Sequence, residues 1–315
     1  CHPFHLIKGS TATPPGGLKV RIITERRMRE GRSAAGTLVL AEPDSAPRPE
    51  TLSAALDQGG LGLITDFLRN TRDETPDALY WANAFTETPG WHVQSGDRAF
   101  IAYCVSPRTG DRLRAEADRG EVVALAESDG RRYSGVLPGV TALLPGRRKE
   151  ELWLMAHLYE PLADDNSSGV ACAVEIARLL KELSASGKLP PLEFSIRVVL
   201  ASEMYGFAAF ADHFGGTLRG RCIGALNLDS LPSGNPGERF QPQLAPAGTP
   251  FFGNSLLEEW AGLYRGVPPV DALREAGGYS DDTFLSDPTV GLPTAWVRSF
   301  GKKFWHHSEL TMDRL

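Results

Sequence analysis

The chain has 315 residues, of which 42% are hydrophobic, and its formal net charge is −6. This length and apolar content are enough for a large core and for two domains, so we expect a globular protein. The acidic excess, with one short basic cluster at 147–149, argues against nucleic acid or an anionic membrane as the main partner. No run approaches the roughly 18 apolar residues that a membrane span needs.

The four cysteines are far apart and include no CxxC pair. Cys172 and Cys222 lie in apolar runs, as small buried hydrophobic residues do, which disfavours both a disulfide framework and a cysteine zinc site. This usage slightly favours a reducing compartment such as the cytoplasm. The chain begins without an initiator Met, a charged segment or an apolar segment, so we expect it to be part of a longer polypeptide.

The first predicted domain spans residues 1–147 and contains short apolar runs separated by Gly, Pro and Asp. Strands are predicted at 36–40, 62–65, 99–105 and 121–125, and helices at 51–56 and 107–114. This pattern is typical of a small, β-rich α+β domain. No cluster of catalytic residue types stands out in it.

The second predicted domain spans residues 148–315, where long apolar strands alternate with helices. Strands are predicted at 151–156, 192–201 and 223–228, and helices at 168–183 and 206–214. The alternation predicts an α/β fold with a mainly parallel mixed sheet and helices on both faces. Ligands of such sheets bind at the carboxyl ends of the strands.

Polar side chains stand at those strand ends and at the start of the first helix. They are His157, Asp165, Glu203, Asp229 and the pair His306/His307. Imidazole and carboxylate together suit zinc, and a further carboxylate that does not bind the ion can accept a proton from water. Each residue alone has a structural explanation, since Asp164 to Asn166 could be helix caps. Their common position at strand ends favours a metal site.

The order of these motifs resembles the co-catalytic zinc aminopeptidase family, which includes leucyl-type aminopeptidases, glutamate carboxypeptidase and, more distantly, glutaminyl cyclases. The resemblance covers about residues 135–315 and rests on His157, Ala163–Gly169, Ser202–Gly206, Asn227–Ser230 and Trp305–Asp313. It implies a zinc peptidase fold. In addition, residues Ala35–Asp66 resemble the protease-associated domain that many members carry beside the peptidase fold.

The resemblance implies a set of zinc ligands. His157 and Asp229 would bind one zinc, Asp165 would bridge two zincs, and a late histidine would bind the other. His306 superposes best on the family's late histidine, and His307 is the alternative.

Two residues receive catalytic roles from the same resemblance. Glu203 would be the general base that takes a proton from water, while zinc polarises the scissile carbonyl and lowers the pKa of its water toward about 7. Tyr279 lies in Gly278–Phe284, a segment that resembles the family's Ser-Asp loop, and by its position it could donate a hydrogen bond to an oxyanion.

The chain departs from the family pattern at two positions. Met204 stands where a second glutamate usually binds metal, and a neutral, soft thioether is a poor zinc ligand. Tyr159 replaces the aspartate of the usual His-x-Asp, which orients the ligand histidine. We therefore expect one firm zinc at His157, Asp165 and Asp229, and a second that is weak, differently liganded or absent. Glu203 could alternatively have been recruited as a ligand.

The favoured function is zinc-dependent hydrolysis of an amide bond, with aminopeptidase action on a peptide or peptide-like small molecule. One alternative is a single-zinc cyclase or acyl-transfer enzyme, which the loss of the second glutamate favours. Another is a degenerate peptidase that serves as a peptide-binding module, and Met204 and Tyr159 are its main support. The sequence predicts neither the side-chain specificity nor an oligomeric state.

Overall fold

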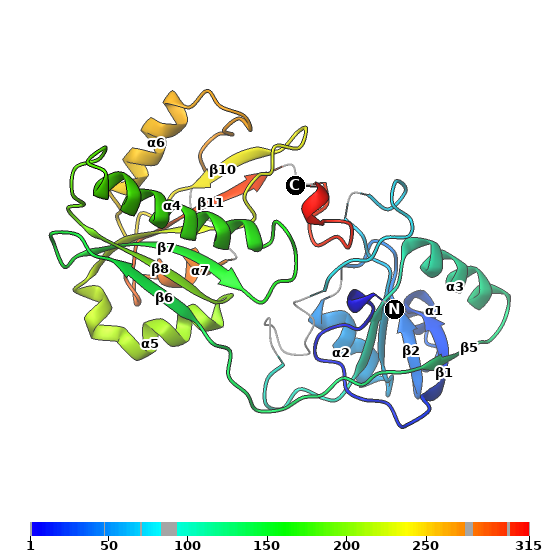
Figure 1. The fold of residues 1–315 in the computed structure, drawn as a ribbon. Coiled ribbons are helices and arrows are strands. Elements are labelled where there is room, and N and C mark those ends of the chain that lie inside the picture. Colours follow the sequence, from blue (N-terminus) through cyan, green and yellow to red (C-terminus); the bar gives the residue numbers. More distant parts are fainter. Residues whose placement is uncertain are drawn as a thin grey trace. The chain divides into compact units, whose positions relative to one another are not determined.

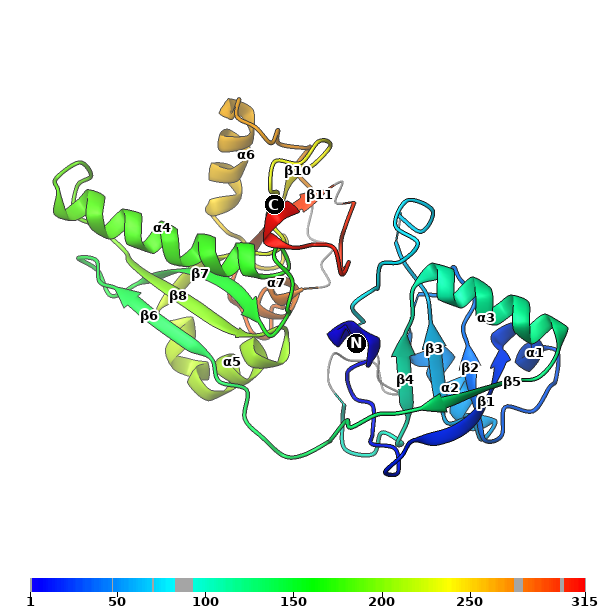
Figure 2. The same cartoon turned by 45° about the vertical axis from the view of Figure 1, so that its right-hand side comes forward.

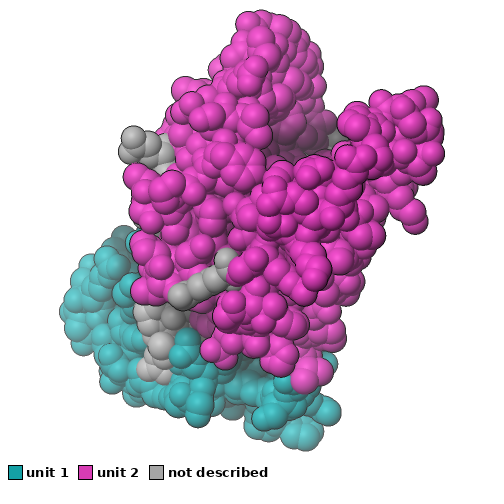
Figure 3. Space-filling view, turned by 90° about the vertical axis from the view of Figure 1, so that its left-hand side faces the viewer, with its two compact units in different colours: residues 1–135, 303–310 teal, residues 136–302, 311–315 magenta. Residues whose placement is uncertain are grey.

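The computed structural model describes residues 2–46, 48–69, 71–82, 93–274, 280–300 and 303–314. The chain forms two compact units, which Figure 3 colours separately. Unit 1 contains Cys1–Gly135 and Lys303–Leu310, and unit 2 contains Val136–Lys302 and Thr311–Leu315. No helix in the described part of the chain combines the length and apolar character needed to cross a membrane.

Unit 1 is built on a five-stranded sheet with the order β4-β3-β2-β1-β5 (Figure 2). The strands are β1 (Leu18–Thr24), β2 (Thr37–Leu40), β3 (Gly62–Thr65), β4 (Ile101–Cys104) and β5 (Val122–Ala126). Strands β1 to β4 are parallel, and β5 alone runs antiparallel, beside β1. The sheet is more parallel than the predicted α+β label implies, and the sequence prediction did not include β1.

Helices cover both faces of this sheet. They are α1 (Glu25–Arg29), α2 (Pro49–Asp57) and α3 (Pro107–Arg119), and a 3-10 helix, η1 (Pro3–His5), precedes β1. Leu52, Ala55 and Leu56 of α2 are buried at helical spacing, and they join the apolar cluster that contains Val39 and Leu63. Leu38 and Ile64, one residue away on the same strands, point into the other cluster with α3.

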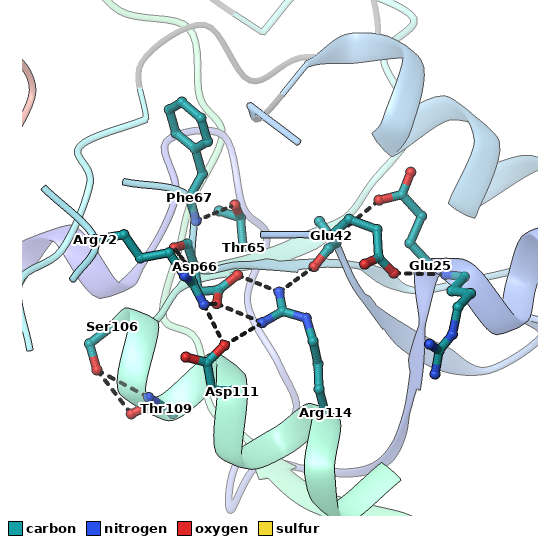
Figure 4. Close-up of polar contacts among 12 residues, drawn as sticks. Glu25, Glu42, Thr65, Asp66, Phe67, Arg72, Ser106, Thr109, Asp111 and Arg114 are labelled. Carbon is teal, nitrogen blue, oxygen red and sulfur yellow. Dashed lines mark hydrogen bonds and ion pairs between the residues drawn. The ribbon is translucent and has the colours of Figure 1, made fainter. Parts of the chain in front are cut away.

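A buried carboxylate with two guanidinium partners lies directly after the carboxyl end of β3 (Figure 4). Asp66 is completely buried, and its carboxylate oxygens lie 2.8 Å from Arg72 Nη2 and 2.5 Å from Arg114 Nη2. Arg72 also binds the exposed Asp111, and a Cβ at Gly110 would come within 2.0 Å of Asp66 Oδ2. The ion pairs therefore fasten α3 tightly to the sheet of unit 1.

Unit 2 is built on a six-stranded sheet with the order β10-β11-β9-β7-β8-β6 (Figure 1). The strands are β6 (Val140–Leu144), β7 (Glu151–Leu158), β8 (Ser195–Ser202), β9 (Cys222–Leu228), β10 (Arg239–Gln243) and β11 (Thr294–Phe300). The four inner strands are parallel, and the two edge strands, β6 and β10, are antiparallel to their neighbours. Strand β6 precedes residue 147, where the predicted domains divide, and pairs within this sheet.

The helices of unit 2 are α4 (Ser167–Ala185), α5 (Tyr205–Arg219), α6 (Gly253–Leu263) and α7 (Asp281–Leu285), and η2 (Met312–Arg314) follows near the end of the chain. Helices α4 and α5 lie on opposite faces of the sheet in Figure 1. Leu154 and Ala156 of β7 pack in the apolar cluster with α4, whereas Trp153 and Met155 pack in the cluster with α5 and α7. His157 follows this alternation and lies on the same side as Met155.

Candidate metal centre

The site of unit 2 lies where three neighbouring parallel strands end. Strands β9, β7 and β8 are adjacent in the sheet, so their carboxyl ends meet at one edge. Each is followed within two residues by a non-glycine residue with left-handed backbone: Ser230 (φ 50°), Tyr159 (φ 74°) and Met204 (φ 55°). This conformation costs about 1–2 kcal/mol per residue, and such strain is concentrated at functional sites.

His157 is the centre of the cluster, and its side chain is 1% exposed. Its Nε2 lies 3.2 Å from Asp165 Oδ1 and 3.7 Å from Glu160 Oε2. Ligand atoms of His157, Asp165 and Asp229 all lie within 4.8 Å of one another. The structure thus brings together the three residues predicted to hold the firm zinc.

Two side chains lie beside the other ring nitrogen of His157. Asp281 Oδ2 lies 3.3 Å from Nδ1, and Asn166 Nδ2 lies at the same distance. Because imidazole that binds metal through one nitrogen donates its other N–H to a carboxylate or carbonyl, Asp281 is placed to orient this ring. Tyr159, which stands at the family's usual position for that aspartate, is instead half exposed and donates to Pro138 O.

Asn166 connects the start of α4 to the end of β9. As the N-cap of α4 it accepts from Gly169 N, and the same Oδ1 accepts from Ser230 N, both at 3.2 Å. Its Nδ2 donates to Leu228 O at 3.0 Å, and a Cβ at Gly169 would come within 2.1 Å of that oxygen. This close packing fixes Asp165, the preceding residue, relative to β9.

Asp229 is buried and held by the segment before α7. Ser280, the N-cap residue of α7, donates from Oγ to Asp229 Oδ2 at 3.1 Å, and Asn227 Nδ2 donates to Ser280 Oγ at 3.3 Å. This chain of hydrogen bonds leaves the second carboxylate oxygen of Asp229 for other partners.

Glu203 lies in the turn between β8 and α5. One carboxylate oxygen of Glu203, a nitrogen of His157 and an oxygen of Glu160 lie within 4.8 Å of one another. The turn is anchored by Met204 N, which donates to Asp281 Oδ1 at 2.6 Å. Asp281 thus contacts both the predicted ligand histidine and the turn that carries the predicted base.

Burial and crowding shift the pKa of several of these groups. Burial by itself lowers the pKa of His157, but the surrounding carboxylates, Asp229 most of all, raise it well above its usual value. Burial raises the pKa of Glu203 well above its usual value, and it raises that of Asp229 to about 7, with neighbouring carboxylates adding to both. These raised pKa values mean that His157, Glu203 and Asp229 retain protons that reduce the repulsion among the carboxylates. A bound cation would reduce the same repulsion and displace the protons.

The donor set fits zinc. Ligand atoms of one imidazole and of carboxylates lie within 4.8 Å of one another, and nitrogen and oxygen are donors that zinc accepts. Asp281, 3.3 Å from the other ring nitrogen, is placed to support the imidazole. The sequence analysis missed two members of this cluster, Glu160 and Asp281. Glu160 lies in a loop and gave no signal, whereas Asp281 lies in Gly278–Phe284, whose resemblance to the family's Ser-Asp loop could have pointed to it.

The two late histidines lie in the segment 303–310 of unit 1. His307 engages both ring nitrogens there, because Glu309 N donates to Nδ1 at 3.0 Å and Nε2 lies 2.9 Å from Thr75 Oγ1. His306 stacks on Trp305 with ring centroids 3.6 Å apart. Because both ring nitrogens of His307 are already engaged, His306 remains the better candidate for a metal ligand. Its role as a ligand stays a prediction.

Tyr279, the predicted oxyanion donor, lies outside the described residues. The described segment resumes at Ser280, which contacts Asp229 as given above. The role of Tyr279 therefore stays a prediction.

The model of peptidase family M28 matches residues 139–315, more than half of the chain. The chain belongs to peptidase family M28. No curated protein matches the sequence of this M28 peptidase.

Solved structures share the fold over nearly the whole chain. The zinc aminopeptidase BSAP from Bacillus subtilis is 16% identical with a TM-score of 0.67, over 98% of this chain and 73% of that one. A peptidase M28 precursor from Shewanella amazonensis is 17% identical, with a TM-score of 0.62 over 98% of this chain and 72% of that one. An aminopeptidase from Aneurinibacillus sp. is 16% identical, with a TM-score of 0.54 and the same coverage.

These findings confirm the predicted family, the mixed α/β fold class and the enzyme class, a hydrolase of the zinc metallopeptidase type. The likeness of Ala35–Asp66 to a protease-associated domain stays a prediction. The roles of individual site residues also stay predictions, and the geometry above supports them to different degrees.

Proposed function

We propose that this M28 peptidase is an aminopeptidase that binds zinc through His157, Asp165 and Asp229. The observation that carries the proposal is the convergence of their ligand atoms within 4.8 Å at the ends of parallel strands. The aminopeptidase reaction is supported by two proteins of the same fold, from Bacillus subtilis and Aneurinibacillus, which are described as aminopeptidases.

Bound zinc supplies Lewis-acid chemistry, which polarises a carbonyl and makes water more acidic. The Asp281 carboxylate, 3.3 Å from Nδ1 of His157, would favour a proton on Nδ1 when Nε2 binds the metal. Glu203, next to this group, accepts a proton from water and returns it to the leaving amine. The raised pKa of Glu203 suits an acid and base that must carry a proton through part of the cycle.

The test compares Glu203→Gln with the wild type on a panel of aminoacyl reporter amides and their N-acetylated counterparts. We expect kcat to fall by about 10²- to 10⁴-fold, because a positioned general base contributes that much, while the zinc content stays the same. The wild type should cleave amides with a free amino group and leave the acetylated ones intact. Glu258→Gln, on the exposed face of α6, is the matched control and should behave as wild type.

Three results would each contradict one part of the proposal. Full activity of Glu203→Gln on every amide that the wild type cleaves would remove Glu203 as the base. Loss of zinc from Glu203→Gln would make Glu203 a ligand instead. Equal cleavage of acetylated and free amides would exclude the aminopeptidase reaction while leaving peptide hydrolysis in place.

A further inference from the structure

Glu160 is a buried acid at the metal centre that neither the motif order nor the resemblance singles out. It follows β7 by two residues, in the loop between His157 and Asp165, and its side chain is 6% exposed. Its Oε2 lies 3.7 Å from His157 Nε2, the nitrogen that faces Asp165. A carboxylate this close to the imidazole is well placed to share a cation with it.

Ligand atoms around His157 fall into overlapping groups. Asp229 belongs to the group with His157 and Asp165, whereas Glu160 belongs to a group with His157 and Glu203. A carboxylate oxygen of Glu160 also lies within 4.8 Å of one from Asp165. Asp229 and Glu160 thus belong to different groups that each include His157, as ligands of two neighbouring cations would.

The turn after β8 offers one carboxylate to this cluster, that of Glu203. Met204 follows it with a neutral thioether side chain, which is a poor ligand for zinc. The backbone of Met204 is fixed by its left-handed φ of 55° and by the bond from its N–H to Asp281. A second zinc must therefore take a carboxylate from another loop.

We propose that Glu160 is a zinc ligand and that, with Asp165, it supplies the second cation position that Met204 cannot serve. This inference rests on the proposed function, because it assumes that His157, Asp165 and Asp229 hold the first zinc. The loop after β7 then contributes to both positions, through His157 to the first and through Glu160 to the second.

The test is a zinc titration of the metal-free protein with the ions alone, followed by competition with a chelating dye and, in parallel, by the visible spectrum of cobalt. We expect wild type to bind two ions per chain and Glu160→Gln to bind the second more weakly, by more than the ~10- to 100-fold that losing an outer partner of a ligand costs. The first ion should bind with unchanged affinity. Glu258→Gln should match wild type.

The double variant Glu160→Gln, Met204→Glu distinguishes the loss of a ligand from a general defect in folding. If Glu160 does what Met204 cannot, the new carboxylate restores the second ion and the second cobalt band. A second ion that binds Glu160→Gln as tightly as wild type, or a wild type that binds one ion, would overturn the role of Glu160 and leave the proposed function standing. A wild type that binds no ion at all would overturn the proposed function itself.

Discussion

Each unit of the protein buries acidic groups, but the two units neutralise them differently. In unit 1, Asp66 has two guanidinium partners, from Arg72 and Arg114, which satisfy both of its oxygens. In unit 2, one imidazole is shared by Asp165, Glu160 and Asp281. The first arrangement fastens a helix, whereas the second gathers carboxylates around His157, where a cation would relieve their repulsion.

The largest difference between the two clusters should appear when the metal is removed, because only the cluster of unit 2 is proposed to hold zinc. In the proposed function the bound zinc polarises the scissile carbonyl. Dialysis against a chelator should therefore reduce peptide hydrolysis to the background rate. Zinc added back should restore it. The Asp66 ion pairs hold no metal in this account, so chelation should leave them intact. Hydrolysis that survives full removal of zinc would contradict the contrast.

Asp66→Asn tests the ion pairs of unit 1, and it should lower stability without affecting zinc. Breaking a buried ion pair by removing one partner costs about 3–5 kcal/mol, so the free energy of unfolding should fall by this amount, as measured by urea denaturation. Asp111→Asn removes an exposed partner of Arg72 and should cost less than about 1 kcal/mol. Neither variant should change the zinc content. Equal destabilisation by the two variants would argue against Asp66 as the fastening point.

Asp281→Asn should weaken zinc binding without removing a ligand. Outer partners of ligand histidines contribute about 10- to 100-fold to metal affinity, and Asp281 takes this role for His157. The neighbouring Asp282 is the matched control, because it is a buried aspartate of the same helix, and Asp282→Asn should leave the zinc affinity unchanged. An unchanged zinc affinity of Asp281→Asn in a competition titration would show that the ring is oriented by another group.

The smallest expected effect is the pH dependence of the metal-free protein. His157, with a raised pKa, stabilises the fold below its unfolded pKa, and this contribution is lost as pH rises through the folded value. Asp229 has a pKa of about 7 in the fold, so between its usual value and 7 the folded state binds more protons and stability falls as pH rises.

Both groups therefore make the metal-free protein more stable at pH 5 than at pH 8. A difference of about 1 kcal/mol would move the melting temperature by about 2–4 °C in a unit of this size. Zinc displaces the same protons, so its stabilising effect should grow with pH. Differential scanning calorimetry with and without zinc measures both trends, and a metal-free protein that is more stable at pH 8 would contradict them.

The sequence predicts the parts of the site that are local. His157 lies near the end of an apolar strand, Glu203 and Asp229 follow apolar strands, and Asp165 precedes a helix. The rule for parallel sheets therefore brings them to one edge. Glu160 gives no such signal, because nothing in a loop sequence says which way its side chain turns.

Asp281 lies in Gly278–Phe284, which resembles the family's Ser-Asp loop, but its contact with His157 was not predicted. It is more than a hundred residues from His157, and the two meet because α7 packs on the face of the sheet toward which β7 directs Met155 and His157. In unit 1, β1 was not predicted, although Leu18 to Ile22 alternate apolar and charged residues, the pattern of a half-buried strand.

The central claim is that unit 2 holds zinc through His157, Asp165 and Asp229, and elemental analysis of the purified protein beside Asp165→Asn tests it most directly. The account predicts at least one zinc ion per chain in the wild type after dialysis and a clear loss in the folded variant. A wild type that retains no zinc yet hydrolyses aminoacyl amides, or a variant that keeps all of its zinc, would contradict it.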